Sequence, residues 1–146
     1  MGNLGPGRDA VVRPAYPHML REDIGVWTRF LESGDFEVKE VWYDVHVGAA
    51  VKGDWDGDSV NDRIARGVTR KRIDVVALVD GVYWVIEIKP IARHIAIGQV
   101  LVYENLFVKE YEPELETWPV IICDRVDEDV IDECGRLGVV VVANLV

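Results

Sequence analysis

The chain has 146 residues, of which 49% are hydrophobic and 29% charged, and its formal net charge is −10 at pH 7. This composition predicts a globular protein with a core of its own and argues against a disordered chain. The negative charge argues against a protein that coats nucleic acid non-specifically, although it is compatible with a local basic patch. The chain has neither an apolar run of membrane-spanning length nor a secretory signal, and its two cysteines form no disulfide framework. We therefore expect a cytoplasmic protein that does not enter a membrane.

The N-terminal part of the chain predicts an arm, a helix and a strand. Residues 1–16 contain glycine, proline and arginine without a period, which predicts a flexible N-terminal arm. Residues 18–33 carry apolar side chains at helical spacing, and Gly34 is suited to the end of that helix. Residues 36–48 alternate imperfectly and predict a long strand, and residues 49–69 predict an irregular segment rich in glycine and aspartate.

A β-hairpin is predicted over residues 72–89. Asp80 and Gly81 stand between two apolar runs, and Asp-Gly is a strong signal for a type I′ turn, which needs positive φ at both central residues. If these two residues form the loop, Val79 pairs with Val82, and each residue i outward pairs with residue 161 − i. We expect Pro90 to end the second strand.

The hairpin register brings acidic and basic side chains onto one face of the sheet. Asp74 lies opposite Glu87, and Lys89 lies two residues further along the same face. Opposed like charges destabilise a sheet, so a compensating cation such as a divalent metal is expected. Asp74, Glu87 and the backbone carbonyl of Ile88 are candidate ligands for Mg²⁺, and Lys89 is a candidate for stabilising charge on a phosphate. In the alternative interpretation these charges project to solvent, with Glu87 and Lys89 as an ordinary ion pair.

The C-terminal half predicts two helices and two buried strands. Residues 92–111 form the longest predicted helix, which is apolar almost all round and should be largely covered. Strands are predicted over 120–123 and 139–143, on either side of a helix over 127–137, and this arrangement favours a parallel pair joined by a crossover. The predicted fold is therefore a single α/β domain over 17–146 with the order α-β-β-β-α-β-α-β, a mixed sheet and helices on both faces.

Gln99 and Tyr103 are four residues apart on the longest predicted helix and share one of its faces. In the functional interpretation this face packs over the hairpin, and Gln99 reaches toward Lys89 or a phosphate. Alternatively, Tyr103 packs in the core and Gln99 lies at a helix edge.

These residues together resemble the PD-(D/E)xK nuclease signature. Asp74 is followed after twelve residues by Glu87-Ile88-Lys89, although Ile73 stands where the signature has proline. The resemblance implies a restriction-endonuclease-like three-layer core and Mg²⁺- or Mn²⁺-dependent cleavage of DNA, less often of RNA. It implies Asp74 and Glu87 as metal ligands and Lys89 as the catalytic lysine.

Two further motifs resemble the RecB-like branch of these nucleases. Gln99 and Tyr103 match its Q-h-x-x-Y motif and imply a supporting catalytic pair. Lys71-Arg72-Ile73-Asp74 is similar to its G-R-h-D motif, with Lys71 in place of glycine. The resemblance implies DNA as a partner, and a homodimer or a separate helicase or recombination protein as candidate partners.

The family also implies an acidic residue on the first helix that contacts the metal or its water. Glu22 is the best-placed counterpart in this sequence, and Asp23 competes with it. An acid favoured by the helix dipole is the alternative interpretation for either residue.

Five basic residues lead directly into Asp74 and form a candidate nucleic-acid-binding strip. Since Arg72 faces Lys89 in the predicted register, such a concentration of cations suits an anionic ligand. A solvated basic face that balances nearby aspartates is the alternative. The strip consists of Arg63, Arg66, Arg70, Lys71 and Arg72.

Four aspartates in the irregular segment resemble the start of a calcium loop. They are Asp54, Asp56, Asp58 and Asp62, but the twelfth position of such a loop is Ala65, which is no ligand. A flexible acidic loop is therefore preferred over a calcium-binding module. The sequence as a whole favours a metal-dependent deoxyribonuclease, with a non-catalytic nucleic-acid-binding or assembly subunit of the same fold as the alternative.

Overall fold

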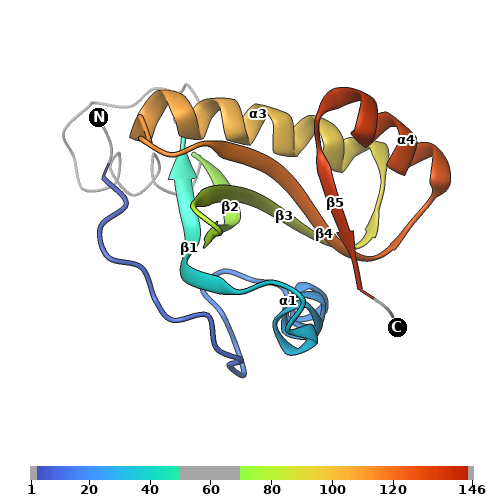
Figure 1. The fold of residues 1–146 in the computed structure, drawn as a ribbon, viewed down its shortest axis with the longest axis horizontal. Helices are drawn as coiled ribbons and strands as arrows, with labels where there is room; N and C mark the ends of the chain where they lie inside the picture. Colours follow the sequence, from blue (N-terminus) through green and yellow to red (C-terminus); the bar gives the residue numbers. More distant parts are fainter. Residues whose placement is uncertain (1–2, 50–69, 145–146) are drawn as a thin grey trace, which may run out of the picture.

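The structure of the protein is a computed structural model that describes residues 3–49 and 70–144. Within these ranges it contains three helices and five strands, in the order predicted from the sequence (Figure 1). The helices are α1 (Arg21–Ser33), α3 (His94–Tyr111) and α4 (Glu128–Leu137). The strands are β1 (Val38–Val47), β2 (Lys71–Val79), β3 (Val82–Ala92), β4 (Thr117–Val126) and β5 (Val140–Ala143). None of the helices in the described ranges is long and apolar enough to cross a membrane.

The five strands form one mixed sheet with the order β1-β2-β3-β4-β5. The β1–β2 and β2–β3 pairs are antiparallel, whereas β3–β4 and β4–β5 are parallel. Helix α1 lies against one face of the sheet, and α3 and α4 lie against the other (Figure 1). The predicted α/β class, with a mixed sheet, helices on both faces and a crossover near the C-terminus, is confirmed.

The β2–β3 hairpin has the predicted turn. Asp80 and Gly81 have φ values of 49° and 75°, as a type I′ turn requires. The register follows the predicted rule, in which paired residue numbers sum to 161, and the pairs are Val79–Val82, Leu78–Tyr83, Ala77–Trp84, Val76–Val85 and Val75–Ile86. Local turn chemistry is therefore sufficient to set this register.

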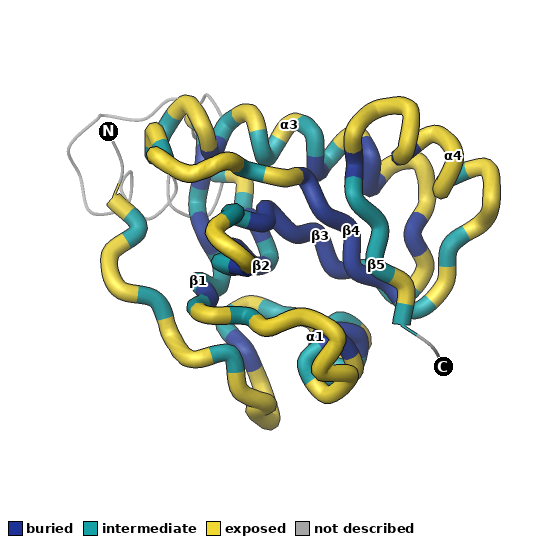
Figure 2. The backbone as a smooth tube through the Cα atoms, in the orientation of Figure 1, coloured by how far each residue is buried: buried dark blue, intermediate teal, exposed yellow. Residues whose placement is uncertain are grey.

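The core is divided by the sheet into an α1 side and an α3 side. Trp27 and Phe30 of α1 pack over the centre of β2 and β3, and Phe107 of α3 packs over β1 and β2 on the other side. A further cluster joins α3 to β4 and α4. Burial is concentrated in the central strands, as Figure 2 shows for β3 and β4.

Several strands and helices differ in their ends from the prediction. Strand β3 continues through Pro90 to Ala92, whereas the sequence predicted a stop at Pro90. The amide of Ile88 points toward β2, and the nitrogen of Pro90, two residues further on, faces the same edge of β3. Proline has no N–H to donate, but the β2–β3 ladder has already ended at this point. No ladder hydrogen bond is lost there, so the strand continues. Strand β4 is also longer than the predicted 120–123, because it pairs with β3 along its whole length.

The N-terminal arm is docked along β1 in the described part, residues 3–16. Arg8 and Val41 exchange two backbone hydrogen bonds of 2.8 and 2.9 Å, and Trp42 donates its indole N–H to the carbonyl of Gly5 at 3.0 Å. Tyr16 is buried among the α1-side core residues. These contacts cover part of an edge strand, which would otherwise expose unpaired backbone groups. The flexibility of this arm stays a prediction.

Candidate active site where strands β2 and β3 separate

The candidate site lies where regular pairing between β2 and β3 ends. The last ladder pair is Val75–Ile86, one residue before the predicted pair of Asp74 and Glu87. Beyond it, Oδ2 of Asp74 accepts a hydrogen bond of 2.9 Å from the amide of Ile88. The Asp74 carboxylate therefore replaces a backbone carbonyl as the acceptor. This hydrogen bond holds Asp74 against β3 where the two strands diverge.

Asp74 and Glu87 are two carboxyl groups that affect each other, of which Glu87 is buried and Asp74 is partly buried. Glu87 is only 4% exposed, and its side-chain Oε1 has no hydrogen-bond partner among the described residues. Burial raises the pKa of Glu87 to about 9, and the nearby charge of Asp74 adds to this rise. Burial also raises the pKa of Asp74 to about 6, against the lowering effect of the Ile88 amide. Both groups therefore disfavour their ionised forms unless a cation accompanies them.

Lys89 is a basic side chain whose charge acts on both carboxyl groups of this pair. Its charge lowers the pKa of both Asp74 and Glu87, although burial outweighs that effect. In the described part of the chain no ion pair joins Lys89 to a carboxylate, so the alternative of an ordinary Glu87–Lys89 pair is not formed. Lys89 instead lines a pocket of about 220 Å³ together with Gln99 of α3. Its ammonium is available to an incoming anion.

Helix α3 brings Gln99 and Tyr103 to this site. Burial raises the pKa of Tyr103, and Glu87 and Asp74 raise it further, which places the phenol close to both carboxyl groups. The side-chain oxygen of Gln99 is buried and has no hydrogen-bond partner among the described residues. Tyr103 also packs against the α3-side core, as in the alternative interpretation, so its role at the site stays a prediction.

On the first helix the structure favours Asp23 over Glu22. Glu22 is exposed, whereas Asp23 is half-buried. Burial raises the pKa of Asp23, the charge of Lys89 lowers it, and Asp23 in turn raises the pKa of Asp74. The sequence placed Glu22 first because only spacing along the helix was available, whereas the orientation of the helix on the sheet brings Asp23 to the site.

The oxygen groups at this site suit a hard divalent cation. Within residues 3–49 and 70–144, no group of three or more His, Cys, Asp or Glu side chains is placed to hold a metal ion. Asp74, Glu87 and the carbonyl of Ile88 would supply the protein ligands. That carbonyl points to the same edge of β3 as its amide, which contacts Asp74. Mg²⁺ is commonly held by one or two carboxylates while it retains several waters, so this small donor set and the unpaired Glu87 oxygen fit it.

Only part of the predicted basic strip reaches this site. Arg70 is held by both oxygens of Glu110, at 2.5 and 2.6 Å, and by the carbonyl of Gly48 at 2.8 Å. Both Glu110 oxygens accept from the same nitrogen, Nη2, and the guanidinium is thus used for structure, contrary to the predicted phosphate contact. Lys71 is exposed at the start of β2, and Arg63 and Arg66 lie outside the described residues.

Arg72 lies beside the site but in a different pairing from the predicted one. Its cross-strand partner is His46 of β1, whereas the predicted rung with Lys89 is absent from the β2–β3 ladder. The reason is the divergence of β2 and β3 beyond Ile86, which leaves Arg72 paired on the β1 side only.

Sequence reasoning missed Asp44 and His18, which the structure places near Asp74. Both line a pocket with Asp74 and Arg72, and the charge of Asp44 raises the pKa of Asp74. The sequence signal for Asp44 was weak, because Lys39 and Glu40 in the same strand are charged too. The calcium-loop aspartates Asp54, Asp56, Asp58 and Asp62 lie outside the described residues.

Comparison with known proteins leaves the family of this chain open. No protein-family model matches the sequence, and no curated protein matches it. Among solved structures, the crystal structure of a protein of unknown function, AF1548, is similar over 82% of this chain, with 21% sequence identity and a TM-score of 0.44. This chain covers 56% of the length of that protein.

Proposed function

We propose that this protein is a metal-dependent nuclease that hydrolyses phosphodiester bonds in DNA, with a site of the PD-(D/E)xK type. The observation that carries the proposal is a buried and a partly buried carboxyl group on neighbouring strands, beside a lysine that forms no ion pair within residues 3–49 and 70–144. Glu87 is only 4% exposed, and its Oε1 has no hydrogen-bond partner within the described ranges; Asp74 contacts the Ile88 amide, and Lys89 follows on the same strand. The core of a folded domain has no structural need for a buried carboxyl group such as that of Glu87, because burying an unpaired charge is costly.

The side chains have distinct roles in the proposed reaction. Asp74, Glu87 and the Ile88 carbonyl would hold Mg²⁺ or Mn²⁺, which when bound polarises a phosphate and lowers the pKa of a water molecule. Lys89 places a positive charge where negative charge develops on the phosphate. Gln99 shares the Lys89 pocket and is a candidate for orienting the lysine or a phosphate oxygen, and Tyr103 is a candidate donor to the substrate backbone.

The fold supports this proposal in its layers and order. A restriction-endonuclease-like core is expected to carry its acidic residues on the central strands of a mixed sheet that helices cover on both sides. The order of strands and helices and the position of Asp74 and Glu87 on β2 and β3 agree with that expectation. DNA, a second copy of the chain, or a separate helicase or recombination protein are the proposed partners.

A non-catalytic nucleic-acid-binding or assembly subunit of the same fold is the second candidate. It is favoured by the absence, within the described ranges, of a third acidic side chain that completes a metal-binding group. In that case Asp74 and Glu87 would be retained without turnover.

The test is a cleavage assay with matched variants. Linear and circular DNA, single- and double-stranded, are incubated with Mg²⁺, Mn²⁺ or EDTA. We expect metal-dependent cleavage that Asp74→Asn and Lys89→Ala each reduce at least about 100-fold, because the first removes a metal ligand and the second removes the positive charge that stabilises the phosphate. Asp35→Asn and Lys109→Ala change the same charges at exposed positions away from the site and are expected to leave cleavage unchanged.

The outcomes separate the two candidates. Binding of DNA without cleavage in any metal supports the non-catalytic subunit. Cleavage that persists in the Asp74→Asn variant overturns the proposed site. Circular dichroism on every variant shows whether a loss of activity reflects a loss of folding.

A further inference from the structure

Strand β1 changes its facing at Asp44. Asp44 has φ 53°, in the left-handed region that L residues seldom adopt, although it lies in the middle of a ten-residue strand. Tyr43 before it packs on the α1 side of the sheet, and Val45 after it packs on the α3 side. The two neighbouring ladder pairs, Tyr43–Val75 and Val45–Ile73, place Asp44 at the rung of Asp74, yet this rung is missing from the ladder. Strained backbone of this kind is concentrated at functional sites.

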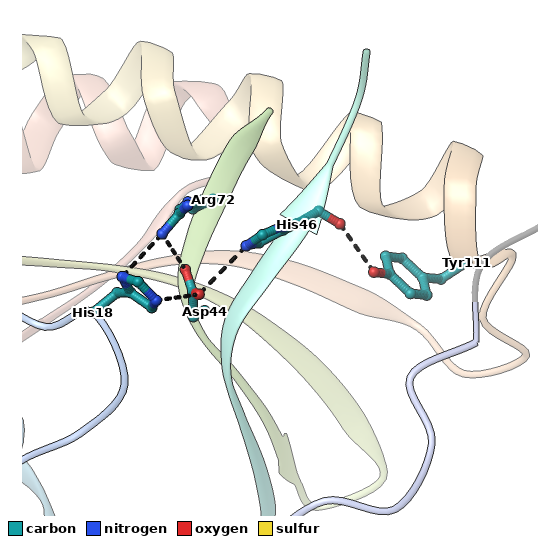
Figure 3. Close-up of polar contacts among 5 residues, drawn as sticks. All are labelled: His18, Asp44, His46, Arg72 and Tyr111. Carbon is teal, nitrogen blue, oxygen red and sulfur yellow. Dashed lines mark hydrogen bonds and ion pairs between the residues drawn. The ribbon is translucent and has the colours of Figure 1, made fainter. Parts of the chain in front are cut away.

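The carboxylate of Asp44 is the centre of a cluster of nitrogen-bearing side chains (Figure 3). His18 and His46 place their Nε2 atoms 3.5 and 3.4 Å from Oδ2, and Arg72 places Nη1 3.6 Å from Oδ1. The Asp44 side chain is only 14% exposed. Tyr111 of α3 donates its hydroxyl to the backbone carbonyl of His46 at 2.9 Å and ties this part of β1 to the helix.

This cluster holds Arg72 by one of its three nitrogens. Nη1 lies 3.0 Å from Nδ1 of His18, and because arginine can only donate, this imidazole nitrogen is the acceptor. The proton of the neutral ring then lies on Nε2, which faces Asp44. Nε and Nη2 of Arg72 have no hydrogen-bond partner within residues 3–49 and 70–144. Asp44 and His18 thus orient the guanidinium and leave two of its nitrogens open.

The pocket beside this cluster reaches the candidate active site. It has a volume of about 220 Å³. It is lined by Pro17, His18, Met19, Asp44, Arg72 and Asp74. A group bound by Arg72 in this pocket would therefore lie next to Asp74, in the direction of β1 and away from Lys89, which lines a separate pocket with Gln99.

We propose that this pocket is a second phosphate-binding subsite, which holds a backbone phosphate of the nucleic acid next to the one that is cleaved. Arg72 contacts the phosphate with its open nitrogens, and Asp44 and His18 are positioning residues that act through Arg72. A guanidinium fork matches two phosphate oxygens, and the charge of Asp44 is already met by the nitrogen groups around it. The inference rests on the proposed function for the identity of its ligand.

The test measures DNA binding in EDTA, where no cleavage occurs, as a function of salt. Fluorescein-labelled single-stranded and duplex oligonucleotides of one sequence are titrated with the full chain at a series of KCl concentrations. Arg72→Ala is expected to weaken binding roughly tenfold and to lower the slope of log K against log salt by about one, because one phosphate contact is lost. Arg136→Ala removes the same charge from exposed helix α4, and should leave both quantities near those of the unmodified chain.

The Asp44→Asn variant separates positioning from simple charge. Removing a negative charge should by itself tighten DNA binding slightly, and Asp129→Asn on α4 measures that effect. Because Asp44 orients Arg72, we expect Asp44→Asn to weaken binding several-fold instead. Asparagine also tolerates the left-handed backbone, so the fold should persist. In the Arg72→Ala background the same change should weaken binding no further.

The outcomes of this test are distinct from those of the cleavage assay. An unchanged salt slope in Arg72→Ala, or an Asp44→Asn variant that binds as tightly as the unmodified chain, overturns the subsite even if cleavage is observed. A salt slope that depends on Arg72 supports the subsite even if no metal produces cleavage. If Arg72→Ala does not fold, the Arg72→Lys variant is used in its place. Lysine keeps the positive charge but lacks the two-pronged guanidinium, so weaker DNA binding is expected. Binding as tight as that of the unmodified chain then overturns the subsite.

Discussion

Glu87 keeps a carboxyl group in the middle of an apolar strand, between the fully covered Ile86 and Ile88. An unpaired charge at such a position costs several kcal/mol, so the group either takes up a proton or is accompanied by a cation. Lys89 lies near enough to lower its pKa but forms no ion pair with it in the described part of the chain. The position of Glu87 in the core is therefore better explained by binding of a ligand than by a contribution to stability.

The pKa of Glu87 leads to a prediction about stability and pH. In the folded, metal-free chain this pKa is about 9, above its ordinary value of 4.5. Between these two values the folded state binds more protons than the unfolded state, so the free energy of unfolding falls as pH rises. Urea denaturation in EDTA at a series of pH values from 5 to 9 should show a decline that is much smaller in Glu87→Gln.

Two controls belong to this pH experiment. Glu133→Gln removes an exposed carboxylate from α4 and should leave the pH dependence of the unmodified chain intact. An identical decline in Glu87→Gln and in the unmodified chain would contradict the assignment of the buried proton to Glu87. Asp74, whose pKa is raised to about 6, adds a smaller decline at the acidic end of the same range.

At the scale of strands and helices, the β2–β3 hairpin is the element that the sequence describes best. Its turn residues lie next to each other in the chain, and their left-handed backbone sets the register of both strands. The observed register ends at Val75–Ile86, so the predicted pair of Asp74 and Glu87 is not formed, and Asp74 is held by the Ile88 amide instead. Pairing between β1 and β2 has no such local determinant, because residues 48–70 separate the two strands.

Two glycines provide a matched test of this turn. Gly81 has φ 75°, and a Cβ atom there would meet no atom within 4 Å, so Gly81→Ala adds backbone strain without a clash. We expect it to destabilise the protein by about 1–2 kcal/mol. Gly135 lies in α4 with equally open space, and Gly135→Ala should stabilise by about 0.5–1 kcal/mol. Chemical denaturation measures both, and a neutral Gly81→Ala would argue against the type I′ turn.

At the scale of the whole molecule, the candidate site is assembled from four separate elements. β2 and β3 provide the carboxyl groups and Lys89, α3 provides Gln99 and Tyr103, and α1 provides Asp23. Because α1 and α3 lie on opposite sides of the sheet, the site occupies the place where β2 and β3 separate and both sides are within reach (Figure 1). A ligand that binds there would bridge β2, β3, α3 and α1.

Metal binding at this site should therefore stabilise the folded chain. A cation that binds the folded state stabilises it by RT ln(1 + [L]/Kd), or about 2.7 kcal/mol at one hundred times Kd. We expect Mn²⁺ or Mg²⁺ to raise the midpoint of thermal unfolding, and EDTA to reverse the rise. The double variant Asp74→Asn with Glu87→Gln should show no rise, whereas Asp35→Asn should respond like the unmodified chain. An equal rise in the double variant would place the ion elsewhere.

The sequence by itself determined the order of helices and strands and the hairpin register from Val79–Val82 to Val75–Ile86. These follow from periodicity and turn chemistry, which act between residues close in the chain. Only the tertiary structure decided that Asp23 rather than Glu22 approaches the site, that Arg70 is held by Glu110, and that Asp44 gathers His18 and Arg72 beside Asp74. Each of these depends on how distant segments pack against one another, and no local pattern encodes that packing.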